Sequence, residues 1–278
     1  MQLYCGIDLH SNNSVVSLID ENDQVIKEKR LDNNLNIIEQ FLAPFQPNIA
    51  GVVVESTYNW YWLVDGLIEK DYAVHLANTL AIQQYNGIKH TNDQTDARFL
   101  AHLLRLDILP TGFIYPKAQR AVSDVLRRRL LMVKQSTAQL LSLQSLIGRH
   151  TGKRLTSQQV KRLQPEDLAD YLTDSSVLFS AQQSLQLWQQ LQQQIEAIET
   201  LVLARCEKDR YTVLTSAPGI GKILGMTILM ETGPIERFIQ VGNYSSYARC
   251  VPSKKISNGK VKGRGNSKNG NRYLSMAF

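Results

Sequence analysis

The sequence predicts an α/β fold in which a mixed β-sheet flanked by helices comes first and mostly helical parts follow. Three β-rich runs open the chain, and later strand candidates alternate with helical spacings. Beyond residue 112, apolar residues recur at helical spacing over two long stretches. We therefore expect an α/β domain over 1–112, a helical or coiled-coil linker over 113–210, and a mostly α-helical C-terminal domain over 211–278.

The first domain opens with a strand in which Leu3, Cys5, Ile7 and Leu9 alternate with Tyr4, Gly6, Asp8 and His10. A second strand is expected over 15–19, after a turn at 11–13, and a third over 24–30. These three consecutive runs form the first part of the expected mixed sheet.

Helices and strands then alternate. Helical spacing over 33–42 stops before Pro44, and the wholly apolar run 51–54 is typical of a buried central strand. A helix is expected through 60–68, a strand over 73–76 and a helix over 94–106. This order of elements is that of a ribonuclease H-like fold.

Residues 117–162 predict a long helix that carries Arg127, Arg128 and Arg129 on its surface and ends in a basic loop with Lys153 and Arg154. The Gln-rich stretch 180–209 follows. Its apolar residues form a heptad-like seam: Leu187, Leu191, Ile195, Ile198 and Val202. This seam fits either an antiparallel hairpin with the preceding helix or a dimeric coiled coil.

Gly219 and Gly221 form a Gly-x-Gly turn before Lys222 and a second helix, which is the pattern of a helix-hairpin-helix. Backbone N–H groups at such a helix start suit a DNA phosphate, although a tight turn without a ligand is the alternative. The tail over 251–278 is rich in Gly, Asn, Ser and Lys. We expect it to form a loop-rich basic surface that orders on nucleic acid.

Charge is unevenly distributed along the chain. The net charge is −7 over 1–116, +10 over 117–162, −6 over 163–236 and +9 over 237–278. Two concentrated basic segments indicate a polyanionic partner, and solvated basic faces are the alternative. The expected nucleic-acid contacts are Arg127, Arg128, Arg129, Lys153, Arg154, Gly219, Gly221, Lys222, Lys254, Lys255, Lys260, Lys262, Arg264, Lys268 and Arg272.

Composition narrows the class of protein. No apolar run reaches the roughly 18 residues that a membrane span needs, and no secretory signal opens the chain. Three cysteines without metal-ligand spacing are typical of reduced thiols. We expect a cytoplasmic protein with no membrane partner.

Four acids are candidates for a metal site. Asp8 lies within a strand, Glu55 ends an apolar strand, and Asp93 and Asp96 open a helix three residues apart. Carboxylates suit Mg²⁺ or Mn²⁺, whose usual task is phosphoryl transfer. Each acid also has an alternative interpretation without a metal. Asp8 would be a buried acid with satisfied hydrogen bonds, Glu55 a surface acid at a strand end, and Asp93 or Asp96 a charge stabilised by the helix dipole. His10, two residues after Asp8, fits a structural role better than the orientation of a water.

Sequence around these acids resembles a known family. Gly6-Ile7-Asp8, Val54-Glu55-Ser56-Thr57, the run from Lys89 to Ala97 and Pro218-Gly219-Ile220-Gly221 resemble the Asp-Glu-Asp-Asp transposases of the insertion-sequence one-ten and eleven-eleven family, and the related pilin-gene DNA invertases. The resemblance covers the chain in order. It implies a RuvC-like first domain, DNA as substrate, a structured guide RNA from the element, and a homodimer or homotetramer.

The resemblance also implies a serine nucleophile in the C-terminal domain, and Ser257 matches it best. Asn258 stands where the family usually has Gly, which leaves Ser253 and Ser267 as weaker candidates. Phe278 falls inside a starting helix where the family continues, so a truncated serine domain is an expectation. A phosphoserine ester would conserve the energy of the broken bond for rejoining.

Three rival functions stay open. The run 6–14 looks like the first phosphate loop of actin- and chaperone-type ATPases, although His10 replaces a needed Gly and no second phosphate loop is found. A junction-resolving or ribonuclease H-type nuclease would use water, and Ser257 would then be irrelevant. The third is a catalytically idle nucleic-acid-binding protein.

Overall fold

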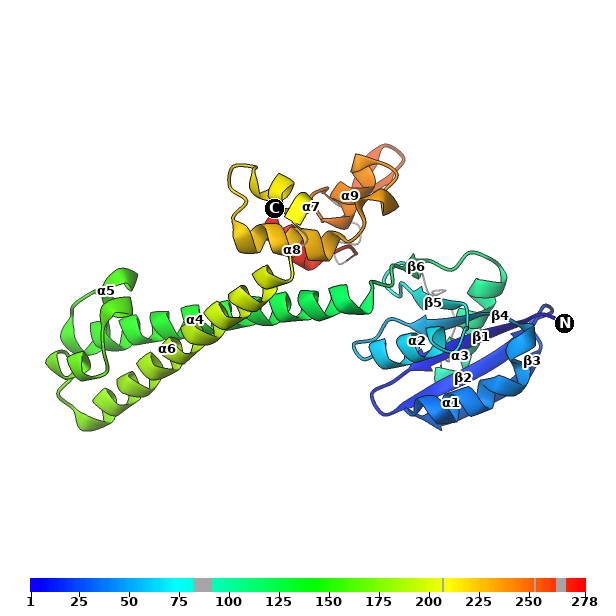
Figure 1. The fold of residues 1–278 in the computed structure, drawn as a ribbon, viewed down its shortest axis with the longest axis horizontal. Helices are drawn as coiled ribbons and strands as arrows, with labels where there is room; N and C mark the ends of the chain where they lie inside the picture. Colours follow the sequence, from blue (N-terminus) through cyan, green and yellow to red (C-terminus); the bar gives the residue numbers. More distant parts are fainter. Residues whose placement is uncertain (83–91, 207, 253, 264–268) are drawn as a thin grey trace. The chain divides into compact units, whose positions relative to one another are not determined.

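The computed structural model describes residues 1–82, 92–206, 208–252, 254–263 and 269–278 (Figure 1). The chain divides into two compact units, Met1–Tyr115 and Pro116–Phe278. The first unit holds a mixed β-sheet with helices, and the second is mostly helical. Among the described helices, none has the length and apolar character that a membrane crossing needs.

The first unit is built on a six-stranded sheet in the order β3-β2-β1-β4-β5-β6. Its strands β1, β2 and β3 pair antiparallel, β1, β4 and β5 pair parallel, and β6 returns antiparallel. The bounds are β1 Leu3–Leu9, β2 Asn13–Asp20, β3 Val25–Asp32, α1 Leu35–Leu42, a 3₁₀ turn Ala43–Asn48, β4 Ile49–Glu55, α2 Tyr61–Ile68, β5 Val74–Ala77, α3 Asp93–Arg105 and β6 Thr111–Gly112.

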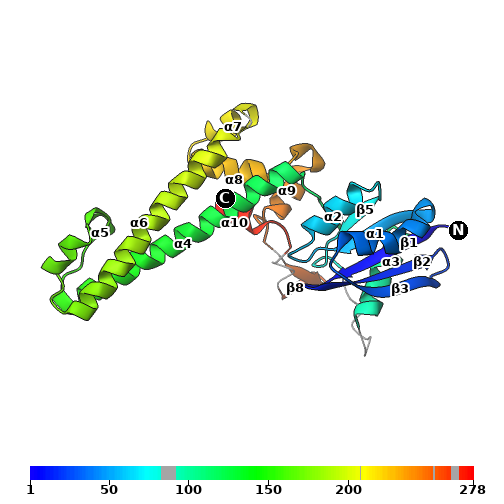
Figure 2. The same ribbon diagram turned by 60° about the horizontal axis from the view of Figure 1, so that its bottom comes forward.

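Alternation along β1 divides its side chains between two faces of the sheet. Cys5, Ile7 and Leu9 share a buried core with residues of α1 and α2. On the opposite face, Gly6 lies against the backbone of α3. Figure 2 shows α1 and α3 on opposite sides of the sheet. Asp8, two residues after Gly6, therefore belongs to the face that α3 covers.

The mixed sheet is consistent with the ribonuclease H-like expectation. The first three strands, the apolar central strand β4 and the helix α3 lie where the sequence predicts them, within two residues at their ends. Strand β6 is a difference, because only Thr111 and Gly112 pair with β5 and two residues give no alternating pattern.

Two long helices form an antiparallel hairpin in the second unit (Figure 1). Its members are α4 Lys117–Thr151 and α6 Ser175–Ala204, and between them lie α5 Ser157–Arg162 and a 3₁₀ turn Glu166–Asp170. Helix α4 ends at the expected basic loop, because Gly152 takes the left-handed conformation with φ of 70°. The remainder of the 117–162 segment forms the separate helix α5, which the sequence analysis did not distinguish.

The apolar seam of α6 faces α4 within the same chain, which is the hairpin alternative. Leu191, Ile195 and Val202 are buried as expected. Leu187 is 43% exposed, and Leu185 is buried in its place. The seam runs through Ala181, Leu185 and Trp188 at spacings of four and three, so Leu187 was assigned to the wrong face of the helix.

A smaller helical group follows the hairpin: α7 Lys208–Thr215, α8 Lys222–Thr232, a 3₁₀ turn Ile235–Arg237, α9 Val241–Tyr247 and α10 Arg272–Ala277. Buried Met226 and Leu229 of α8 pack with Val122 and Leu126 of α4 and Val202 of α6. The tail is not only loop, because β7 Lys255–Ser257 and β8 Lys260–Gly263 form an antiparallel hairpin.

Candidate functional site

Three elements of the first unit bring the four predicted acids to one edge of the sheet. Asp8 lies near the end of β1, and Glu55 ends β4, its parallel neighbour, so both carboxyl ends meet at the same edge. Val53 packs with Leu100 of α3, which places Glu55, two residues on, on the face of α3 as well. Asp93 and Asp96 open α3 on that face.

Gly6 allows α3 to lie close to β1. A Cβ at this position would be 1.9 Å from the carbonyl oxygen of Ala97 and 2.9 Å from the backbone nitrogen of Ala101. Only a residue without a side chain fits there. The glycine two residues before Asp8 therefore sets the separation between Asp8 and the first turn of α3.

Asn92 fixes where α3 begins. Its side-chain oxygen accepts a hydrogen bond from the backbone N–H of Thr95 at 2.9 Å, and the Thr95 hydroxyl oxygen accepts one from the Asn92 N–H at 2.9 Å. This capping box makes Asp93 the first helical residue and Asp96 the fourth. Both carboxylates then gain from the positive end of the helix dipole.

The cluster crowds negative charge into a partly buried place. Asp8 is 3% exposed. Burial, a hydrogen bond with Asp8 and the charges of Asp8 and Asp96 raise the pKa of Glu55 to about 8. Burial and the charges of Asp8 and Asp93 also raise the pKa of Asp96. The three carboxyl groups therefore oppose one another's ionisation, which a divalent cation would reverse.

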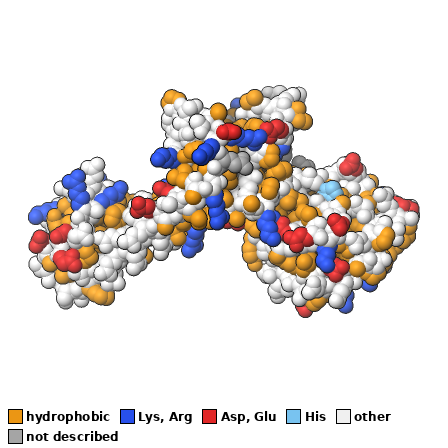
Figure 3. Space-filling model, in the orientation of Figure 1, with side chains coloured by type: hydrophobic (Ala, Val, Ile, Leu, Met, Phe, Trp, Pro, Cys, Tyr) orange, Lys and Arg blue, Asp and Glu red, His pale blue; other side chains and the backbone are white. Residues whose placement is uncertain are grey.

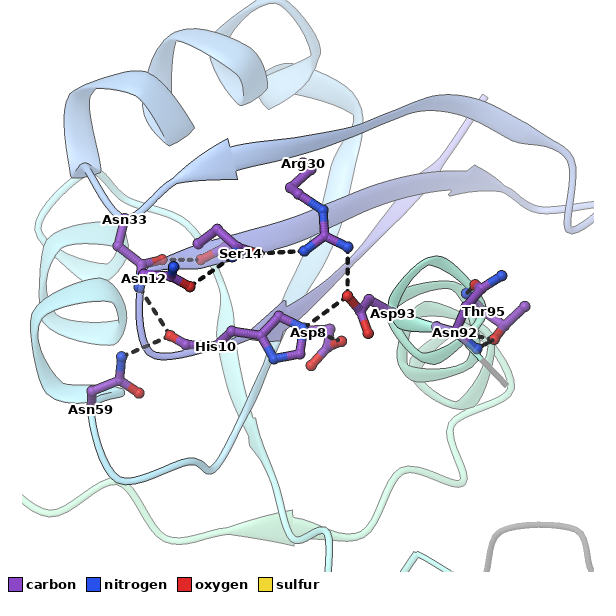
Figure 4. A network of polar contacts seen from close by, with 11 residues as sticks. Asp8, His10, Asn12, Ser14, Arg30, Asn33, Asn59, Asn92, Asp93 and Thr95 are labelled. Carbon is purple, nitrogen blue, oxygen red and sulfur yellow. Dashed lines mark hydrogen bonds and ion pairs between the residues drawn. The ribbon is translucent and has the colours of Figure 1, made fainter. Parts of the chain in front are cut away.

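Asp93 has a different environment, with two basic side chains beside it (Figure 4). Nη2 of Arg30 lies 2.5 Å from Oδ2 of Asp93, and Nε2 of His10 lies 3.3 Å from the same oxygen. The Arg30 hydrogen bond, with the charge of His10, holds the pKa of Asp93 below its usual range. Asp93 is thus ionised more readily than Glu55 or Asp96.

His10 is held at the site by its backbone. Its carbonyl oxygen accepts hydrogen bonds from Nδ2 of Asn33 at 2.9 Å and Nδ2 of Asn59 at 3.0 Å, and its N–H donates to the carbonyl of Asn13 at 2.9 Å. These bonds fix the end of β1 against α1 and the segment before α2 (Figure 4).

The donor set fits a hard divalent cation. Carboxylate oxygens are the ligands that Mg²⁺ and Mn²⁺ take, and their mutual repulsion explains why a cation would be bound here. Atoms of Asp8, His10 and Asp93 lie within 4.8 Å of one another, which is close enough for one ion. Asp8, Glu55 and Asp96 would hold a cation on the more buried side of the cluster.

Ser257, the predicted nucleophile, belongs to the second unit and is exposed at the end of β7. The next two residues form the hairpin turn, with φ of 50° at Asn258 and 70° at Gly259. An Asn-Gly pair with two positive φ angles is the preferred two-residue hairpin turn. Asn258 therefore suits the position where the family usually has Gly. Ser253 and Ser267 lie outside the described residues.

Both ends of the segment that carries Ser257 are tied to the helical core. The Arg249 guanidinium donates two hydrogen bonds to the carbonyl of Gly270, at 3.1 and 2.8 Å. The Asn271 N–H donates to the carbonyl of Tyr247 at 2.6 Å, and its side-chain amide donates to Oε2 of Glu231 at 2.6 Å. Arg127 of α4 binds the same carboxylate through two hydrogen bonds, at 2.7 and 2.9 Å.

The expected surface triplet on α4 is only partly correct. Arg128 is exposed, whereas Arg127 pairs with Glu231, which is 1% exposed, and Arg129 pairs with Glu199 at 2.6 Å. These two arginines join α4 to α8 and α6. With Gly221 and Lys222 they also line a cavity of about 340 Å³ in the second unit.

The remaining expected nucleic-acid contacts lie on the second unit, where Figure 3 shows Lys and Arg side chains toward both ends of the helical hairpin. Gly219 takes a positive φ of 89° in the turn before α8. The exposed residues are Lys153, Arg154, Lys222, Lys254, Lys260, Lys262 and Arg272. Lys255 lies on β7, and Arg264 and Lys268 lie outside the described residues.

Several residues of the site were missed or undervalued in the sequence. His10 was set aside as structural, Gly6 was noted only as part of the first strand and its motif, and Arg30 was noted only as the end of a strand. Asp8-x-His10 on one strand was a usable signal for His10, since alternation puts both on one face. Arg30 and Glu231 gave no signal, because their charged partners Asp93 and Arg127 lie 63 and 104 residues away.

Two family models match the chain. A model of the DEDD transposases of IS110 covers residues 5–151, which include all four acids and more than half of the chain. A model of the transposase IS116/IS110/IS902 family covers residues 211–278, which include Ser257 and the Gly219–Gly221 turn. A search of curated proteins finds no match.

Proposed function

Because this chain belongs to the IS110 family of transposases, we propose that it cuts and rejoins the DNA of an insertion sequence through a serine–phosphate intermediate. The observation that carries the proposal is the acidic cluster at one edge of the mixed sheet. Burial, together with a hydrogen bond to Asp8 and the charges of Asp8 and Asp96, raises the pKa of Glu55 to about 8. A purely structural role without a bound ligand gives no reason to place three carboxylates so close together.

The cluster would hold Mg²⁺ or Mn²⁺, which would supply charge neutralisation at a DNA phosphate. Asp8 would be the central ligand, since its burial leaves it the least freedom to move. Asp93 would keep its charge through Arg30, so the cluster retains a ligand at neutral pH before any ion arrives.

Ser257 would supply the nucleophile. Its oxygen would form a bond to the scissile phosphorus, the bond from phosphorus to the deoxyribose oxygen would break, and that oxygen would take up a proton. The phosphodiester energy would stay in the phosphoserine ester, so the reverse attack by a DNA hydroxyl could join a different strand. Lys254, Lys260 and Lys262, exposed on the same segment, would neutralise the phosphate.

The two basic segments would bind DNA and a structured guide RNA from the element. These segments carry net charges of +10 and +9 and are separated by an acidic segment. This pattern fits two regions that contact one nucleic acid, or two regions that each contact a different nucleic acid. A homodimer or homotetramer is part of the proposal. The α6 seam does not support a coiled-coil dimer, because it packs against α4 of its own chain.

The test is covalent linkage between protein and DNA on a denaturing gel. We expect the wild-type protein, with Mg²⁺, element-end DNA and RNA transcribed from the element, to give a slower band that protease removes. Ser257→Ala should abolish the band and leave binding to nucleic acid unchanged. Ser275→Ala, at an exposed serine of α10, is the matched control and should keep the band.

The metal site is tested in the same assay with Asp8→Asn, which should lose cleavage and adduct together. Asp71→Asn is its control, because Asp71 is exposed in the same unit and its positive φ of 64° suits Asn. Cleavage without an adduct in the wild type would favour the hydrolytic nuclease. An adduct that survives in Ser257→Ala would refute the assigned nucleophile.

A further inference from the structure

His10 presents a buried nitrogen to the acidic cluster. Its side chain is 37% exposed, but the Nε2 atom itself is buried and makes no hydrogen bond. That atom lies 3.2 Å from Oδ2 of Asp8 and 3.3 Å from Oδ2 of Asp93. Both contacts have ion-pair distance without hydrogen-bond alignment. A cation bound between the three side chains would satisfy this buried polar atom.

These separations are those of neighbouring metal ligands. Oxygen ligands about 2.1 Å from an octahedral ion lie about 3.0 Å from their neighbours. The distances of 3.2 and 3.3 Å from Nε2 to the two carboxylate oxygens exceed this value by only a few tenths of an ångström. Small side-chain rotations would close the difference, and the backbone bonds of His10 already fix its position.

Asp8 divides the cluster into two sides of different chemistry. Glu55 shares a hydrogen bond with Asp8, and Asp96 adds its charge to that pair, so one side offers oxygen only. On the other side lie His10 and Asp93, which with Asp8 offer one nitrogen and two oxygens. Arg30 approaches Asp93 from outside this group, on the side of β3 (Figure 4).

We infer that His10 is a metal ligand and that the cluster holds two unlike cation positions, which share Asp8. One position is formed by Asp8, Glu55 and Asp96, and the other by Asp8, Asp93 and His10. The inference rests on the metal site of the proposed function and adds a ligand to it. An imidazole nitrogen suits first-row transition ions better than Mg²⁺, so the second position prefers Mn²⁺ to Mg²⁺.

The test is Mn²⁺ binding by the full-length protein, measured by calorimetry and by pulsed electron paramagnetic resonance. We expect two classes of Mn²⁺ site in the wild type and a nitrogen coupling on the bound ion. His10→Ala should remove the coupling and weaken one class about 10- to 100-fold. Its Mg²⁺ affinity should change less than about threefold, because Mg²⁺ takes oxygen ligands.

His102→Ala is the matched control. His102 is in the same unit, its side chain is 38% exposed, and it pairs with Asp23 outside the cluster. It should keep both the coupling and the affinities. His10→Asp is the second variant, which replaces nitrogen by oxygen: it should still bind Mn²⁺, without the coupling and with a smaller preference over Mg²⁺.

The outcomes separate this inference from the proposed function. Mn²⁺ binding without nitrogen coupling in the wild type overturns the role of His10 and leaves the acid site standing. A coupling that persists in His10→Ala also overturns it. Absence of any Mn²⁺ or Mg²⁺ binding by the wild type would remove both. Loss of the adduct in Ser257→Ala is independent of all three results.

Discussion

Gly6→Ala should separate the acidic ligands without touching any of them. The added Cβ would lie 1.9 Å from the carbonyl oxygen of Ala97, whereas ordinary contact begins at 3.4 Å. About 1.5 Å of movement is therefore needed. The neighbour is backbone in the middle of α3, so no side-chain rotation can supply it. The helix must move away from β1, and it carries Asp93 and Asp96 with it.

Two effects of different size follow from this displacement. Overpacking a core costs about 1–3 kcal/mol, and a clash with backbone belongs at the upper end of that range. We expect the free energy of unfolding of the first unit to fall by about 3 kcal/mol, with a decrease in melting temperature on the order of 10 °C. A misplacement of about 1 Å costs about 100-fold in rate, so adduct formation should fall at least that far.

The measurement is urea unfolding followed by the adduct assay at a temperature where the variant stays folded. Gly112→Ala is the matched control. Its Cβ would find the nearest atoms at 3.7 Å, which is ordinary contact, and the free energy of unfolding should change by less than about 0.5 kcal/mol. Wild-type stability and adduct yield in Gly6→Ala would show that α3 does not set the spacing of the acids.

Three further predictions concern other parts of the chain. In metal-free protein, the pKa of Glu55 is raised from 4.5 to about 8, so the folded state binds more protons than the unfolded state between these pH values. The free energy of unfolding should therefore fall as pH rises from 4.5 to 8. Urea titrations in EDTA should show a flatter slope in Glu55→Gln, and an unchanged slope would contradict the crowding of carboxylates. Glu231→Ala leaves the Arg127 guanidinium without its buried partner and should lower the free energy of unfolding by about 3 kcal/mol. Part of this stability should return in the Glu231→Met, Arg127→Met double variant. Additive losses in a double-mutant cycle, measured by urea unfolding, would show that the pair is uncoupled. Asn258→Ala removes the short polar side chain that lets Asn adopt φ of 50° and should cost the hairpin about 1 kcal/mol, whereas Asn258→Gly should be tolerated. Limited proteolysis within 251–263 checks this, and equal cleavage of both variants would count against the turn.

Local patterns predicted much of the first unit, because each of its elements carries its own signal. Asp8 was found because an acid in a strand of buried residues needs a partner, and Glu55 because it ends an apolar run. Asp93 and Asp96 were found because two acids three residues apart at the start of a helix share one face. The convergence of these four side chains depends on Gly6, whose close contact with Ala97 is made across 91 residues of chain and leaves no local pattern.

The failures in the second unit have separate physical causes. The β7–β8 hairpin was missed although Asn258-Gly259 is a strong hairpin signal, because the surrounding residues are too polar to alternate. Leu187 was placed in the seam because it continues a spacing of four from Leu191, whereas a helix of 3.6 residues per turn needs spacings of three as well. Arg127 and Arg129 were expected on the surface, because their acidic partners lie on other helices.

Because of the hydrogen bonds at Arg249, Gly270 and Asn271, the stability of the helices depends little on the length of the segment that carries Ser257. The two ends of this segment are bonded to one another through Arg249 and Gly270, and Asn271 is also bonded to Glu231. The helical core therefore contacts two fixed anchor points, whatever residues lie between them. Doubling the length of a flexible closed loop costs only about 0.6 kcal/mol. Insertions and exchanges between the anchors are therefore tolerated by the fold, and the reach and charge of the hairpin can diverge while the scaffold stays constant.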